Sequence, residues 1–154
     1  MAEDAITMRW TTEQFDSMTW HDNHVYALRI EEGEWGSGRL TLDIDYIMEW
    51  VKIESKINFR VIPARLIFLE VSELRMNLDY AAASAAHGPF SIHAITRRSE
   101  GRQRYVAQIW NIAINWPKGE FEFMASGFEQ IARGNPILCD EQRLGRDQRM
   151  EILI

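Results

Sequence analysis

Apolar and polar residues alternate along much of this chain, and a period of two is typical of β-strands with one buried face. The expected strands are Val25–Glu31, Arg39–Trp50, Phe59–Val71, Leu74–Tyr80, Phe90–Arg97, Arg104–Trp116 and Glu120–Ala125. We therefore predict a mainly β fold whose antiparallel sheet of about seven strands is curved, closed into a barrel or folded as a sandwich.

Glycine and proline mark the connections between these strands. A glycine-rich link from Gly33 to Gly38 predicts an antiparallel hairpin of the first two strands. Turns at 99–101 and 117–119 predict a three-stranded meander near the end. Pro63 cannot donate a ladder hydrogen bond, so we expect an edge, a bulge or a bend there, with the regular strand after it.

The strand predicted at Arg104–Trp116 is apolar on both faces. Such a strand is covered on both sides, by a helix, a second sheet layer or another subunit. Its length also predicts curvature or a bulge.

Two or three short helices are expected beside the sheet. Thr11 with Gln14, and Ser126 with Glu129, have the spacing of capping boxes. The second predicted helix would end at Gly134. The alanine-rich residues 81–87 form either a helical turn or a loop.

The 154 residues, 46% of them hydrophobic, are enough for one domain with its own core. No repeat or linker divides residues 1–154. Residues 134–154 mix charged with apolar side chains, so we expect a tail docked on its own domain or on a neighbouring chain. This tail and the doubly apolar strand also favour a homodimer.

The net charge of −6 disfavours nucleic acid and anionic membranes as partners and favours a basic protein. Arginines gather late in the chain, at Arg97, Arg98, Arg102, Arg104, Arg143, Arg146 and Arg149. Carboxylates interleave with them, at Glu100, Asp140, Glu141, Asp147 and Glu151. We interpret the mixture as a solvated surface in preference to a phosphate-binding patch.

Localisation and disulfide chemistry are constrained by what the sequence contains. Its apolar runs are far shorter than the roughly 20 residues of a membrane-spanning helix. Its first residues do not resemble a signal peptide, so we expect a cytoplasmic protein. A single cysteine, Cys139, excludes an internal disulfide.

The strongest candidate for chemistry combines His21 and His24 with Asp43 and Asp45. Imidazoles and carboxylates are ligands of divalent metals, and the predicted hairpin would bring these residues near one another. The competing and favoured interpretation is a turn in which Asp22 and Asn23 bond to local backbone groups.

No other catalytic set stands out. His87 and His93 have no identifiable orienting acid, and Cys139 has no catalytic signature. No serine lies in a Gly-x-Ser-x-Gly motif, and the glycines match no phosphate-binding loop. We predict no cofactor, and a noncatalytic protein is favoured over an enzyme.

The six tryptophans are the other notable side chains. Trp35 lies between a glutamate and a glycine in the predicted hairpin loop, where a large ring gains little burial. We therefore single out Trp35 as a candidate interaction residue. An alternative places an apolar ligand pocket near Trp110 and Trp116.

Two short motifs near the start carry a family resemblance. The segments Trp20-His21-Asp22-x-x-Val25 and Leu40-x-Leu42-Asp43 resemble the opening of small uncharacterised bacterial domains, some grouped with the immunity proteins of polymorphic toxin systems. The resemblance spans about the first third of the chain. It implies a cytoplasmic, β-rich protein that neutralises a toxin by binding it.

The leading functional hypothesis is thus a noncatalytic, immunity-like protein-binding domain. A metal-assisted enzyme using His21, His24, Asp43 and Asp45 is the first alternative. A small-ligand-binding β domain is the second.

Overall fold

The computed structural model describes residues 6–81 and 88–153, and these form a mainly β structure, as predicted. Its strands are β1 (Thr7–Thr11), β2 (His24–Glu32), β3 (Gly38–Ile53), β4 (Lys56–Leu78), β5 (Phe90–Gly101), β6 (Val106–Trp116), β7 (Gly119–Met124), β8 (Gly127–Arg133) and β9 (Ile137–Cys139). All their pairings are antiparallel. The predicted antiparallel sheet is confirmed, with nine strands in place of about seven.

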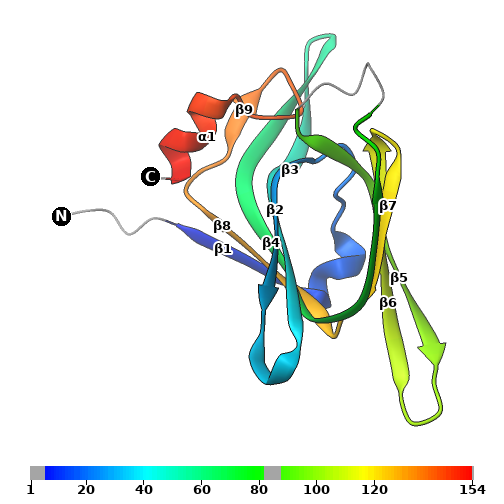
Figure 1. Ribbon diagram of the computed structural model, residues 1–154. Coiled ribbons are helices and arrows are strands. Elements are labelled where there is room, and N and C mark those ends of the chain that lie inside the picture. The colour runs from blue at the N-terminus through cyan, green and yellow to red at the C-terminus, as the bar shows by residue number, and fades with distance from the viewer. Residues whose placement is uncertain (1–5, 82–87, 154) are drawn as a thin grey trace.

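The sheet curves until its ladder closes on itself, in the order β4-β3-β2-β5-β6-β7 and back to β4 (Figure 1). The β2–β5 pairing that closes the ring is short, because it consists of two residue pairs, His24 with Ser91 and Val25 with Phe90. β4 completes the ring because its 23 residues reach several partners. One edge of β4 pairs with β3, and the other pairs in turn with β9, β8 and β7.

The core fills the inside of this ring. Trp110, Phe68, Phe121 and Phe123 are among its largest fully buried side chains. The indole N–H of Trp110 donates to the carbonyl oxygen of Ala125 (3.1 Å), so the buried polar atom is satisfied.

The predicted first helix is confirmed as a 3-10 helix, η1 (Thr12–Ser17). The side chain of Gln14 accepts a hydrogen bond from the Thr11 backbone N–H (2.7 Å), as a capping box requires. Phe15 of η1 packs against the rings of Trp20 and Trp110, with centroids 5.8 and 5.1 Å away. This helix therefore packs against the core of the ring through Phe15.

The predicted strands at 59–71 and 74–80 are parts of the single strand β4. Left-handed backbone at Glu70 (φ 53°) and Glu73 (φ 52°) bends β4 where its partner changes from β8 to β7. Pro63 pairs with Asp45 of β3, and it lies between the β4 residues that pair with β9 and those that pair with β8. β4 starts at Lys56, so the expectation of a regular strand only after Pro63 is wrong.

The helix predicted from Ser126 to Gly134 is also wrong, because Gly127–Arg133 is the strand β8. This segment is flanked by β1 on one edge and β4 on the other. Phe128, Gln130 and Ala132 are buried at alternate positions, a period of two that fits a strand. Hydrogen bonding to β1 and β4 thus makes this segment a strand, although Ser126 and Glu129 have the spacing of a helix capping box.

The C-terminal segment lies against the outside of the ring. β9 pairs with β4, and Leu144 packs in a second small core with Ile47, Phe59 and Val61. The chain then forms α1 (Arg146–Leu153). The alanine-rich residues 82–87, including His87, lie outside the described residues. In the described part of the chain, no helix is long and apolar enough to cross a membrane.

Both faces of β6 carry buried side chains, the outer face only near the start of the strand. Trp110, Ile112 and Ile114 belong to the core inside the ring. On the outer face Ala107 and Ile109 are also buried, and Ile109 lies between its cross-strand neighbours Arg98 and Met124. Side chains of the same chain thus account for much of the burial that the sequence pattern predicted.

Candidate functional site

The carboxylates proposed as metal ligands are both paired with arginines. Asp43 accepts hydrogen bonds from Arg29 (2.7 Å) and Arg65 (2.9 Å). Asp45 is fully buried and accepts two from Arg149, at 3.0 and 2.6 Å. These two carboxylates therefore hold neighbouring strands and the C-terminal segment together.

The two candidate histidines lie in different surroundings. His21 is exposed, 3.4 Å from Asp22 and, through Nδ1, 3.0 Å from the carbonyl oxygen of His93. His24 is opposite Asp45 in the β2–β3 ladder, and its buried Nδ1 has no partner among the described residues. Burial, followed by the positive charge of Arg143, lowers the pKa of His24. His24 therefore favours its neutral form.

The turn that contains Asp22 and Asn23 has a local backbone bond, from the Asn23 N–H to the Trp20 carbonyl oxygen (3.0 Å), but the two side chains bond to partners far along the chain instead of to local backbone groups. Asp22 accepts hydrogen bonds from Asn115 (3.2 Å) and Gln142 (2.8 Å). Asn23 accepts one from the backbone N–H of Ile47 (3.3 Å). Within residues 6–81 and 88–153, no group of three or more His, Cys, Asp and Glu is placed to hold a metal ion.

The tryptophans near the alternative ligand pocket differ in exposure. Trp110 is fully buried against Phe68 and Phe128, with ring centroids 5.4 and 5.9 Å away. Trp116, at the end of β6, is half exposed.

Trp35 is the most exposed large apolar side chain of those described, at 99%. It lies in the β2–β3 loop, residues 33–37, with left-handed backbone (φ 58°, ψ 33°). The loop is closed by hydrogen bonds from Gly33 N–H to the Ser37 carbonyl (2.7 Å) and from the Ser37 hydroxyl to the Glu34 carbonyl (2.6 Å). The indole ring is thus exposed to solvent on a loop whose backbone is fixed by hydrogen bonds.

A hollow of about 310 Å³ lies beside this loop. Leu69 and Glu70 of β4 contribute to its wall, together with Trp35 and Arg39. Glu70 is exposed and is one of the two left-handed residues of the β4 bend. The Trp35 loop and the β4 bend therefore border the same depression.

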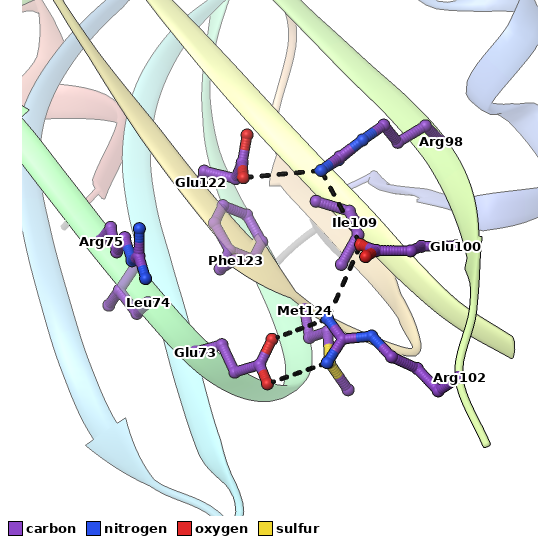
Figure 2. A pocket seen from close by; sticks show the side chains of 10 residues that line it. All are labelled: Glu73, Leu74, Arg75, Arg98, Glu100, Arg102, Ile109, Glu122, Phe123 and Met124. Atoms are coloured by element: carbon purple, nitrogen blue, oxygen red, sulfur yellow. Dashed lines mark hydrogen bonds and ion pairs between the residues drawn. The ribbon is translucent and has the colours of Figure 1, made fainter. Parts of the chain in front are cut away.

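A second hollow, of about 520 Å³, lies between the β4 bend and the β5–β6 hairpin (Figure 2). Arg102 spans it and contacts both carboxylate oxygens of Glu73, at 3.0 and 3.3 Å. Further ion pairs join Arg102 to Glu100, Glu100 to Arg98, and Arg98 to Glu122, at 3.6 to 3.8 Å. Positive and negative side chains thus alternate across the hollow, whose lining also includes Ile109 and Met124.

The tip of the β5–β6 hairpin adds exposed apolar surface. Tyr105 is 53% exposed and Val106 63% exposed. Figure 1 shows that the β2–β3 loop, the bend of β4 and this hairpin tip all lie at one end of the ring. We call residues 33–37, 70–75 and 101–106 the Trp35 end.

In and beside the Trp35 loop the carboxylates outnumber the cations, whereas the Trp35 end as a whole has three carboxylates, Glu34, Glu70 and Glu73, and three arginines, Arg75, Arg102 and Arg104. Glu32, Glu34 and Glu70 form no ion pair with another described residue. Arg39 is the cation beside them, and it too is without an ion pair to the described residues. The loop therefore presents an aromatic ring within an excess of carboxylate.

Backbone strain also concentrates at the Trp35 end. Five described non-glycine residues have positive φ, and three of them, Trp35, Glu70 and Glu73, lie here. Such conformations persist only where the surrounding structure enforces them, and they gather at functional sites. The sequence singled out Trp35 but not Glu70 or Glu73, since neither glycine nor proline marks the bend.

Comparison of this chain with protein-family models, curated proteins and solved structures gives no match.

Proposed function

We propose that this chain is a noncatalytic protein-binding domain whose Trp35 loop docks on a basic surface of a partner protein. By its resemblance to immunity-like domains, the partner would be a toxin of the bacterial cytoplasm. The observation that carries the proposal is the fully exposed Trp35 on a hydrogen-bonded loop with left-handed backbone.

The energetics of protein interfaces support a contact role for this ring. Tryptophan is among the residues that contribute most to binding when they enter a pocket on a partner. Because the loop around Trp35 is already closed by hydrogen bonds, little backbone freedom remains to be lost on binding.

The surrounding carboxylates indicate which partner surface would fit. The negative charges of Glu32, Glu34 and Glu70 outnumber the positive charge of Arg39. Lysine and arginine side chains on a partner would therefore be attracted to the Trp35 loop. Complementary charge of this kind mainly accelerates association and selects the partner. Salt should therefore slow association at this end of the molecule.

The first test is capture of a partner by the purified full chain from a lysate of its native host. The wild type is compared with Trp35→Ala and with the control Ile57→Ala, which removes an exposed apolar side chain near the β3–β4 turn. Retained proteins are identified by mass spectrometry, and binding is then measured with the purified partner.

We expect one basic protein to bind the wild type and Ile57→Ala but not Trp35→Ala. Equal binding of the purified partner to Trp35→Ala would overturn the proposal. So would the absence of any protein whose retention depends on Trp35.

A further inference from the structure

A third hollow, of about 530 Å³, lies beside α1 and is lined by Tyr26 of β2 and by residues of the C-terminal segment. Three arginines contribute to its wall, Arg143, Arg146 and Arg149. Glu141 is the one carboxylate among its lining residues, although Asp140 and Asp147 are close in sequence. Acidic and basic residues are interleaved along this segment in the sequence. In the structure, three of its arginines line the hollow together, with one carboxylate beside them.

The three guanidinium groups differ in what they contact. Arg149 is bound to Asp45 and to the carbonyl oxygen of Leu144, and it lies 3.9 Å from the centre of the Tyr26 ring. By contrast, Arg143 and Arg146 form no ion pair with any described residue. Two guanidinium groups at this hollow are thus available to a ligand, opposed by Glu141.

Apolar and neutral polar surface completes the wall. Tyr26 and Pro89 contribute to it, whereas Leu144 lies behind the wall with only 2% of its surface exposed. Burial, followed by the charges of Asp43 and Asp45, raises the pKa of Tyr26 to about 12. Its phenol is protonated at neutral pH, as that of an ordinary tyrosine is, and the guanidinium of Arg149 lies over its ring.

Guanidinium groups match the geometry of carboxylate and phosphate oxygens and donate paired hydrogen bonds to them. We propose that the hollow between Tyr26 and α1 binds a small organic anion, whose carboxylate or phosphate lies against Arg143 and Arg146 and whose apolar body lies against Tyr26 and Pro89. This site is separate from the Trp35 end, because α1 and the β2–β3 loop lie at different ends of the molecule (Figure 1).

The test measures binding of four probes to the full chain by isothermal titration calorimetry. Phenyl phosphate and benzoate carry the two anionic groups on an apolar ring, inorganic phosphate lacks the ring, and benzylamine reverses the charge. The variant is Arg143→Gln with Arg146→Gln, and the control is Arg104→Gln, an exposed arginine in the β5–β6 hairpin.

We expect phenyl phosphate, benzoate or both to bind the wild type and Arg104→Gln with equal affinity. The double variant should bind about tenfold more weakly or worse, since it loses the charged hydrogen bonds of both guanidinium groups. Comparison of phenyl phosphate with benzoate distinguishes a phosphate from a carboxylate ligand. Weaker binding of inorganic phosphate would show the contribution of the apolar wall.

Saturable binding by neither aromatic anion would overturn the proposal, as would equal affinity in the double variant or equal binding of benzylamine. Thermal unfolding without ligand verifies that the double variant folds. If it does not, Arg146→Gln alone provides the same test, because Arg146 is exposed. Trp35→Ala should bind the probes like the wild type, so this test is independent of the proposed protein-binding function.

Discussion

Asp45 of β3 and Arg149 of α1, 104 positions apart, form a buried ion pair. Their side chains are 0% and 11% exposed, and two hydrogen bonds of 3.0 and 2.6 Å join them. Asp45 also accepts a hydrogen bond from the backbone N–H of Leu144 (3.2 Å). The Asp45 carboxylate thus adds to the β9–β4 pairing in holding the C-terminal segment on the outside of the ring.

Replacing Asp45 with Asn should lower the free energy of unfolding by about 3–5 kcal/mol, because it leaves the Arg149 charge buried without its counterion. Urea unfolding followed by tryptophan fluorescence measures the loss. Glu49→Gln is the control, since Glu49 pairs with Arg60 on the exposed surface and should change stability by about 1 kcal/mol or less. Equal effects of the two substitutions would contradict the structural role of Asp45.

Acid should destabilise the protein partly through His24. Its pKa is lower in the folded state than the ordinary 6.5, so the unfolded state takes up the proton more readily. The stability that the neutral imidazole contributes is present above about pH 6.5 and is lost as the pH falls through the folded-state pKa. His24→Gln should therefore reduce the loss of stability between neutral and acidic pH.

Denaturant unfolding at several pH values checks this expectation against His93→Gln, which removes an exposed imidazole from β5. A pH dependence that is the same in His24→Gln and the wild type would show that His24 plays no part.

Glu70→Gly should raise the free energy of unfolding by about 0.5–1 kcal/mol. Glycine adopts left-handed backbone without the steric penalty of about 1–2 kcal/mol, a gain reduced by its larger entropy loss on folding. Glu32→Gly is the matched control, because Glu32 is not among the residues with positive φ and should lose stability. Thermal unfolding of both variants distinguishes strain from a general effect of glycine.

Local patterns in the sequence were enough to predict most of the sheet. Alternation and turn residues correctly indicated the β2–β3 hairpin and the meander of β5, β6 and β7. They did not separate β8 from a helix, because Ser126 and Glu129 have capping-box spacing while the pairing partners of β8 lie far away in sequence. Closure of the ring depends on such distant pairings and was left open.

Among the candidate sites, too, local sequence could indicate one, while the others depend on contacts between distant residues. Trp35 could be found because a large ring beside Glu34 and Gly36 has nothing in its neighbourhood to cover it. The ion pair of Glu73 and Arg102 could not be found from the sequence, because 29 positions separate the two residues and the bend of β4 brings them together. Asp45 resembled a metal ligand because its partner, Arg149, lies in a distant helix.

The central claim is that Trp35 serves binding and contributes nothing to folding. Its most direct test is to measure, for wild type and Trp35→Gly, both the free energy of unfolding and the affinity for the partner captured from the host. Because Trp35 is 99% exposed and has a φ of 58°, glycine should leave stability unchanged or raise it. Affinity should fall about thirtyfold or more, as for a residue at the centre of an interface. Unchanged affinity, or a loss of affinity that accompanies unfolding, would contradict the account.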